Sequence, residues 1–298
     1  MKRTIIALLL TTACTVPQTS ETKEDSVAAL SQDTLQVVQG DQKAIEADTT
    51  RLTDIHSAFN APQNDTKIAF VYREDGLPVY QTLNDVGDTT KALEVLGYGE
   101  MIELTDPLIN NQRSDKTIFE GFKGRYIAMT MADGTPGYVF SGYLTNFPVP
   151  IDSVQIVDYF LKYFQLLETP RHITSRSKME GTPEWFKTQL KFESGIIIDD
   201  DGYYEGASTY VTLPASCTMQ EGFLFLRAFK DMEAFAKAFP TYPTKKFEKT
   251  IDDTHSAAVQ TDEHGISNIS FSDTSGCSDD TSVVRDEGRI KIGRGGGC

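Results

Sequence analysis

The chain has 298 residues and is strongly acidic, with 43 Asp and Glu against 28 Lys and Arg and a formal net charge of −15 at pH 7. This charge excludes nucleic acid as an expected partner, because the field of the chain repels a polyanion. At about 100–200 residues per domain, the length predicts two small domains.

The N-terminus has the residue order of a secretory signal. Lys2 and Arg3 precede an apolar run at residues 5–10, which small residues connect to Cys14. The run is much shorter than the roughly 18 residues of a membrane-spanning helix. We therefore expect residues 1–13 to be a signal peptide and the chain to be exported, facing the periplasm or the cell exterior.

The end of this segment, Ala13-Cys14, resembles the signal of bacterial lipoproteins. The resemblance implies cleavage before Cys14, attachment of a diacylglycerol to its thiol, and anchoring in the cell membrane or the outer membrane by several acyl chains. Thr11 stands where that family usually has leucine. The alternative is an ordinary secretory signal, in which Cys14 carries no lipid.

Residues 14–66 are predicted to be a partly helical tether. They are polar and contain one aromatic residue, Phe59, so they bury little apolar surface on their own. Val38, Ile45 and Leu52 fall seven residues apart, as on one seam of a helix. Polar residues at the intervening seam positions argue against a coiled coil.

Residues 67–148 are predicted to form a small all-β unit, because short apolar runs alternate there with turn signals such as Asp75-Gly76 and Asp133-Gly134. The expected strands are 68–72, 77–80, 92–96, 101–104, 125–131 and 137–140.

The order and spacing of residues in this unit resemble the bacterial SH3-like domain family. The matching segments are Leu77-Pro78-Val79-Tyr80, Gly97-Tyr98-Gly99, Tyr126, Gly137-Tyr138-Val139 and Ser141-Gly142-Tyr143-Leu144. The resemblance implies a small barrel that binds cell-wall peptide or glycan, or that spaces other domains. Tyr80 and Tyr138 stand where the family usually has arginine and tryptophan.

Tyrosines of this unit are candidates for a ligand groove, as aromatic grooves bind extended peptides in other small β domains. About half of them must instead fill the core of so small a barrel. We expect Tyr80, Tyr98 and Tyr138 to be the exposed, ligand-binding set.

A second domain, residues 149–298, is expected after the stiff segment Phe147-Pro148-Val149-Pro150. Helices are predicted at 152–168 and from the capping box Thr218–Glu221 to Phe239. Strands are predicted within 186–213, with Asp199–Gly202 as a turn, and at 257–260, 266–271, 282–285 and 289–292. The fold class is therefore mainly β, a small SH3-like barrel followed by an α+β domain of no recognised family.

Besides Cys14, the chain has Cys217, Cys277 and Cys298, so at least one thiol of an exported chain stays unpaired. A Cys277–Cys298 disulfide is the candidate pair, since an oxidising compartment permits it and it would hold the C-terminal tail.

An alternative hypothesis is that the protein is a cysteine-dependent cell-wall hydrolase. Cys217 comes just before a predicted helix, whose dipole would lower the pKa of its thiol, and His264 could act as base. Papain-like cell-wall peptidases have this order, but they place Asp before and Ser-Gly after the cysteine, where this chain has Ser216 and Thr218. We favour a structural Cys217 and expect no catalytic residue.

No metal or cofactor is expected. The acidic run at residues 199–202, with Glu205, lacks the alternating ligands of a calcium loop, and the four histidines contain no close ligand pair. A basic group near the C-terminus is expected to neutralise acidic neighbours such as Asp286 and Glu287: Arg285, Arg289, Lys291 and Arg294.

Together these patterns predict a non-enzymatic, lipid-anchored envelope protein. Its SH3-like domain is expected to bind peptidoglycan, as peptide or glycan, or a partner protein of the envelope. The alternatives are the hydrolase built on Cys217 and His264, and a structural spacer without a ligand.

Overall fold

The computed structural model describes residues 67–108, 117–150, 154–175, 185–203, 206–276 and 278–297. The predicted signal peptide, the tether with Cys14, and both cysteines of the candidate disulfide, Cys277 and Cys298, lie outside the described residues. The described parts belong to one compact unit that spans residues 51–298. None of their helices is long and apolar enough to cross a membrane.

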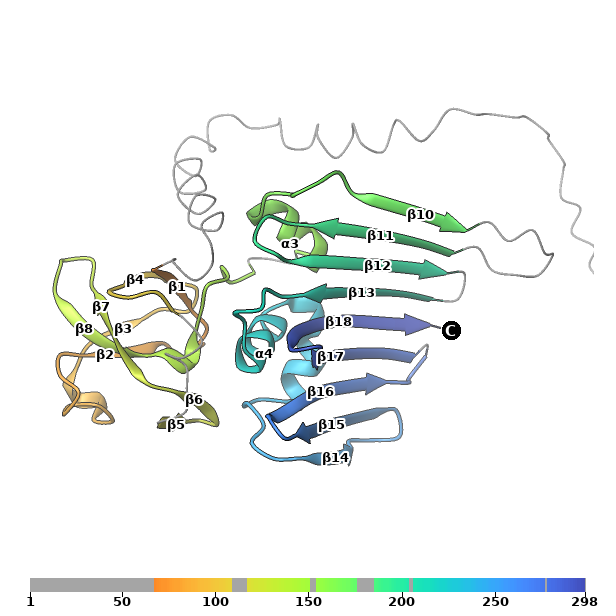
Figure 1. Ribbon diagram of the computed structural model, residues 1–298. Helices are drawn as coiled ribbons and strands as arrows, with labels where there is room; N and C mark the ends of the chain where they lie inside the picture. The colour runs from red at the N-terminus through yellow and green to blue at the C-terminus, as the bar shows by residue number, and fades with distance from the viewer. Residues whose placement is uncertain are drawn as a thin grey trace, which may run out of the picture. The chain divides into compact units, whose positions relative to one another are not determined.

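The N-terminal part is an antiparallel sheet of seven short strands in the order β3-β2-β8-β7-β4-β1-β9 (Figure 1). The strands are β1 (Ile68–Val71), β2 (Leu77–Tyr80), β3 (Ala92–Leu96), β4 (Met101–Leu104), β7 (Tyr126–Thr130), β8 (Pro136–Phe140) and β9 (Leu144–Thr145). Every strand predicted from sequence in this part is present. Within the described residues the sheet is open, with β3 and β9 at its two edges.

Three short elements complete this part. A separate hairpin is formed by β5 (Thr117–Phe119) and β6 (Phe122–Gly124), which the sequence patterns did not predict. Two single 3-10 turns lie at η2 (Thr89–Lys91) and η4 (Ser141–Tyr143).

The C-terminal part is a nine-stranded antiparallel sheet in the order β10-β11-β12-β13-β18-β17-β16-β15-β14. Its strands are β10 (Arg171–Ser175), β11 (Trp185–Lys191), β12 (Ile197–Tyr203), β13 (Gly206–Thr212), β14 (Phe247–Thr250), β15 (His255–Asp262), β16 (Gly265–Asp273), β17 (Ser278–Asp286) and β18 (Arg289–Gly297). Two meanders, β10–β13 and β14–β18, meet at their last strands, so β13 and β18 form the centre of the sheet.

Short helices cover one face of this sheet, as expected of an α+β domain: α3 (Ile156–Tyr163), α4 (Met219–Arg227), η5 (Lys230–Met232) and α5 (Glu233–Ala238). The facing residues of the central strands are apolar and fully buried, among them Val211, Val283 and Ile292. The capping box is confirmed, since the Thr218 hydroxyl accepts from the Glu221 N–H at 3.3 Å and the Glu221 carboxylate from the Thr218 N–H at 2.9 Å.

Both predicted helices are shorter in the structure. The first begins at Ile156 and ends at Tyr163, instead of spanning 152–168. The second is interrupted after Arg227, because Phe229 has extended backbone angles (φ −78°, ψ 133°). The interruption places the Phe229 side chain in the core, where it is 1% exposed.

The acidic run Asp199–Gly202 is not a turn, which corrects the sequence prediction. It lies inside β12, where the carboxylates alternate between the two faces of the sheet. The Asp199 carboxylate accepts from the Gln189 side chain at 2.8 Å and lies 3.2 Å from the Lys187 ammonium. These partners on β11 stabilise the acidic strand, and the reversal falls after Tyr203.

Residues 146–150, in the segment that joins the two sheets, are buried, and one carbonyl among them is shared. The Pro148 carbonyl accepts hydrogen bonds from the Tyr72 hydroxyl, at 2.8 Å, and from the Tyr159 hydroxyl, at 2.7 Å. Tyr72 follows β1 of the first sheet and Tyr159 belongs to α3 of the second part. The two parts are thus held to the same point of the linker.

The β5–β6 hairpin makes a second connection. The Gln220 side chain at the start of α4 accepts from the Lys123 N–H and donates to the Lys123 carbonyl, both at 2.7 Å. The Phe122 ring packs on Tyr242 and Phe223, with centroids 5.5 and 6.0 Å apart. Gly121 has φ +85°, and a Cβ there would stand 2.6 Å from the Tyr242 carbonyl oxygen.

Replacing Tyr72 or Tyr159 by Phe should each lower the free energy of unfolding by about 1 kcal/mol, because one buried hydrogen bond is lost. The double variant should lose more than the sum, since it leaves the Pro148 carbonyl without either donor. Urea unfolding of the four proteins measures this coupling. Tyr138→Phe, on the half-buried side of β8, is the matched control; strictly additive losses would contradict the shared carbonyl.

Candidate functional site

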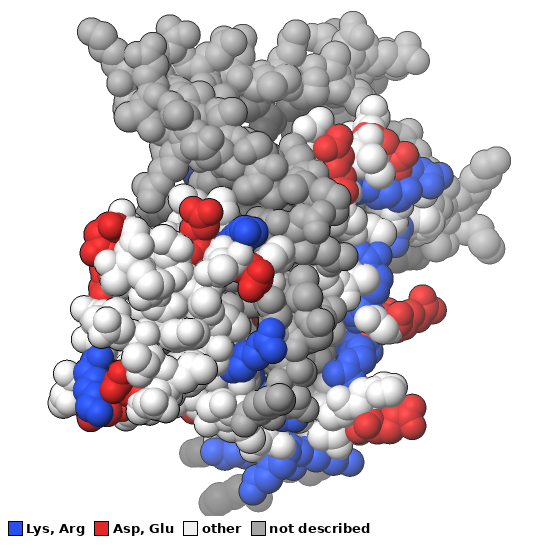
Figure 2. Space-filling view, turned by 60° about the vertical axis from the view of Figure 1, so that its left-hand side comes forward, with Lys and Arg blue, Asp and Glu red and all other residues white. Residues whose placement is uncertain are grey.

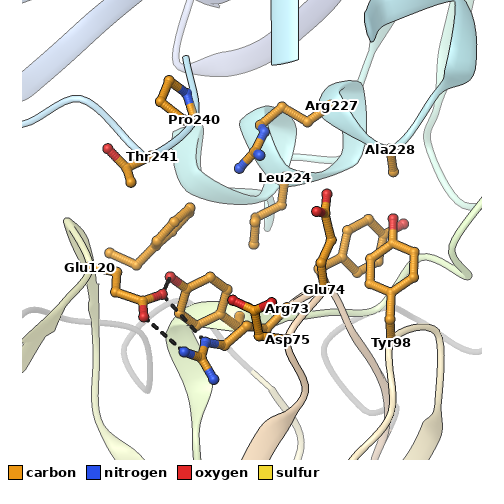
Figure 3. A pocket seen from close by; sticks show the side chains of 13 residues that line it. Arg73, Glu74, Asp75, Tyr98, Glu120, Leu224, Arg227, Ala228, Pro240 and Thr241 are labelled. Carbon is orange, nitrogen blue, oxygen red and sulfur yellow. Dashed lines mark hydrogen bonds and ion pairs between the residues drawn. The ribbon is translucent and has the colours of Figure 1, made fainter. Parts of the chain in front are cut away.

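A cleft lies where the turns of the N-terminal sheet meet the end of α4 and the chain after α5. Its cavity is about 110 Å³ and its lining is mainly polar. Figure 3 shows Arg73, Glu74 and Asp75 from the β1–β2 turn on one side and Arg227 from α4 on the other. The site is therefore built from both parts of the described unit.

One wall is a closed network around Glu120, in the β5–β6 turn. The Arg73 guanidinium lies 2.8 Å from the Glu120 carboxylate, and the Tyr143 hydroxyl donates to the same group. The guanidinium also lies over the Phe119 ring, 5.2 Å from its centroid. The hydrogen bond from Arg73 lowers the pKa of Glu120, whereas burial, followed by the Glu120 contact, raises the pKa of Tyr143.

This network orients the hairpin and leaves little donor capacity for a ligand. Glu120 has φ +51°, a left-handed conformation that is strained for a non-glycine residue. The ion pair with Arg73 and the hydroxyl of Tyr143 hold it there. The Arg73 guanidinium also donates to the Gly76 carbonyl at 2.6 Å, so it ties the β1–β2 turn to the hairpin.

The opposite wall contains Arg227, whose hydrogen bonding differs from that of Arg73. Arg227 is the last residue of α4, and its guanidinium lies over the Phe223 ring at 5.4 Å. Its Nε atom is buried and has no hydrogen-bond partner among the described residues. Burial lowers the pKa of Arg227, and the nearby charge of Glu74 opposes that shift. A buried donor without a partner is uncommon, so this side chain is a candidate to bind an acceptor.

Glu74 and Asp75 place negative charge across the cleft from Arg227, and Tyr98 stands at its rim (Figure 3). The Tyr98 side chain is 42% exposed, and its ring packs edge-on against Tyr72 at 6.3 Å. Partial burial, followed by the charge of Glu74, raises the pKa of Tyr98 to about 12, so its hydroxyl stays protonated. The cleft thus offers a cation, two carboxylates and an aromatic face to one ligand.

The three predicted ligand-binding tyrosines do not come together. Tyr98 is exposed as expected and lines the cleft. Tyr80 is only 2% exposed, so the prediction of an exposed Tyr80 is wrong; its ring packs on Tyr126 with centroids 5.9 Å apart. The register of β2 against β3 shifts between Val79 and Tyr80, so both of these neighbouring side chains are buried and the simple alternation of faces does not hold there. Tyr138 is partly exposed on β8 and does not line the cleft.

Cys217 and His264 also lie outside the cleft. Cys217 is partly buried against the core just before α4, and its N–H donates to the Pro214 carbonyl at 2.9 Å. His264 is in the turn between β15 and β16, with a side chain 69% exposed and 3.5 Å from Glu263. Among the described residues, no group of three or more His, Cys, Asp or Glu side chains could hold a metal ion.

The basic residues near the C-terminus have partners on other strands of the sheet or in the chain beside it. Arg285 pairs with Asp262 at 3.1 Å and Arg294 pairs with Asp279. Arg289 donates to the Leu213 carbonyl at 2.9 Å. The neutralisation expected from sequence therefore involves different carboxylates from Asp286 and Glu287. Acidic and basic side chains are interspersed on the face shown in Figure 2.

Comparison with known proteins finds no match: no protein-family model, no curated protein and no solved structure matches this chain. Arg227 and Glu74, the two most informative residues of the cleft, carry no sequence signal, because they meet only when α4 packs beside the β1–β2 turn.

Glu120→Gln should lower the free energy of unfolding by about 1 kcal/mol at pH 7, because it removes a partly exposed ion pair and two charge-assisted hydrogen bonds. The folded-state pKa of Glu120 is lowered, so its stabilisation is present above the ordinary glutamate pKa and is lost as the pH falls through the lowered value. The difference from wild type should therefore vanish in acid.

Urea unfolding between pH 7 and pH 3 measures this change. Glu94→Gln, at an exposed position of β3, is the control and should match the wild type throughout. A difference for Glu120→Gln that does not depend on pH would show that the carboxylate acts by shape and not by charge.

Proposed function

We propose that this protein is a non-enzymatic lipoprotein of the bacterial envelope, exported by its N-terminal signal and anchored through Cys14. Its residues 67–148 are a domain of SH3-like type that binds cell-wall peptide in the cleft beside α4. The short antiparallel strands at the positions of the family motifs support this assignment. The sheet, open between β3 and β9, is a departure from a closed barrel.

The observation that carries the proposal is the Arg227 guanidinium, which has a buried donor without a partner and faces Glu74 and Asp75 across a small cleft. Such a site complements a ligand with a carboxylate and an ammonium group close together. Cell-wall peptides carry both groups, whereas the glycan strand offers mainly hydroxyl and amide groups. The lining therefore favours the peptide over the glycan.

The size of the cleft limits what it holds. A cavity of about 110 Å³ is below the roughly 300–1,000 Å³ of sites that enclose a whole small-molecule ligand. It accommodates the end of a peptide, with Tyr98 providing an apolar face at the rim. This reading favours reversible retention on the wall over the spacer alternative, which gives Arg227 no role.

Arg227→Gln should reduce retention on purified cell-wall sacculi at least tenfold, because the cation that meets the peptide carboxylate is removed. Co-sedimentation of the full-length protein with sacculi measures retention. Lys230→Gln, an equal change of charge at an exposed site one turn further on, should bind as the wild type does. Free muropeptides should compete, and peptide-free glycan strands should not.

The same incubation separates the alternatives. Release of muropeptides that disappears in Cys217→Ala would replace the proposal by the cysteine hydrolase. Equal retention of wild type and Arg227→Gln would remove the cleft as the binding site. No retention of either would leave only the structural spacer.

The anchor is tested by growing cells with a labelled fatty acid and measuring label in the purified protein. We expect label in the wild type and none in Cys14→Ser, because the thiol is the only group that the proposed diacylglycerol transfer can alkylate. Cys217→Ser is the matched control and should be labelled fully. Equal labelling of wild type and Cys14→Ser would reject anchoring at this residue.

A further inference from the structure

A second cavity lies far along the nine-stranded sheet from its centre, between α5 and the edge strand β14. Its volume is about 600 Å³, several times that of the cleft, and its lining is mainly apolar. We call it the edge groove. Its floor is formed by Phe247 of β14, Ala257 of β15 and Phe271 of β16.

The edge groove exists because the helix layer ends before the sheet does. α5 has six residues, and Phe235 is the one that it buries. Ala234 and Ala238 face the groove with small side chains, so space remains above the floor. Ile251 at the mouth is 43% exposed, an apolar side chain in contact with water.

Every charged side chain that lines the edge groove is basic, although the chain as a whole has a net charge of −15. Lys237 is 2.6 Å from Glu233 on the same helix, so it already has an acidic partner. Lys249 makes no ion pair with any residue in the described part of the chain. It is the cation at the mouth that remains available to a ligand.

His255 lies beside the apolar floor. Its ring stacks on Phe271 with centroids 5.7 Å apart and an interplanar angle of 24°. Its two nitrogens face Asp252, at 2.8 Å, and Asp273, at 3.4 Å. His255 lines the groove, stacks on Phe271 and has both ring nitrogens directed at carboxylates.

We infer that the edge groove binds a single-chain amphiphile with a carboxylate head, with the alkyl chain over Phe247, Ala257 and Phe271 and the carboxylate at Lys249. The volume lies within the range of sites that enclose small ligands. The apolar floor supplies affinity, and the basic rim selects an anion. The inference uses no residue of the cleft, so it stands or falls apart from the proposed function.

Calorimetric titration with octanoate, decanoate and dodecanoate, each below its critical micelle concentration, tests whether the edge groove binds the alkyl chain of the ligand. The full-length protein carries Cys14→Ser, so that no acyl chain is attached there and no detergent is needed. We expect Kd to fall about fourfold for each added methylene, the equivalent of ~0.8 kcal/mol. Absence of decanoate and dodecanoate binding would overturn the inference.

Two variants test separately the contact of the ligand carboxylate with Lys249 and the space in the edge groove for the alkyl chain. Lys249→Gln should raise the Kd of decanoate about fivefold and leave that of the neutral 1-decanol unchanged, whereas Lys246→Gln, next to the groove but not in its lining, should change neither. Ala234→Trp, at an exposed position of α5, should fill the mouth and weaken both ligands. Unchanged decanoate binding in Lys249→Gln, or in Ala234→Trp, would place the ligand elsewhere.

Discussion

The carbonyl of Pro148 is the point on which the arrangement of this protein depends. It is buried in the linker between two sheets, and it accepts the hydroxyl of Tyr72 from one side and that of Tyr159 from the other. A buried carbonyl must be hydrogen-bonded, and here both donors come from elements that would otherwise be free to separate. The linker is therefore a joint of fixed geometry.

The polar cleft is a consequence of this joint. The fixed linker brings the β1–β2 turn close to the end of α4. The Arg73–Glu120 ion pair then fixes the β5–β6 hairpin, which forms one wall of the cleft. The two arginines of the cleft differ because Arg73 forms an ion pair with the Glu120 carboxylate, and Arg227 forms none with the described residues. Arg73 has its acceptors and holds the hairpin, whereas the buried Nε of Arg227 has no hydrogen-bond partner among the described residues.

The edge groove has a different origin. The nine-stranded sheet extends past the short helix α5, so part of its apolar face at β14–β16 has no helix above it. The lining of the cleft is mainly polar and charged, whereas that of the edge groove is mainly apolar with lysines at its rim. The two sites lie on different elements and can be occupied together.

The sequence by itself determined what depends on local pattern. Six strands of residues 67–148, β1–β4, β7 and β8, follow from alternation and turn residues, and the start of α4 follows from its capping box at Thr218 and Glu221. The signal, the lipid anchor at Cys14 and the Cys277–Cys298 pair remain predictions from sequence, outside the described residues.

Tertiary structure decided everything that depends on a partner distant in the chain. The acidic run that begins at Asp199 forms a strand because Lys187 and Gln189, on the neighbouring strand β11, contact the Asp199 carboxylate. Tyr80 belongs to the core because the strand register shifts between Val79 and Tyr80, which buries both side chains, and because the Tyr80 ring packs on Tyr126. Arg227 became a candidate binding residue only when α4 met the first sheet, since no spacing along the chain encodes a contact made across a buried joint.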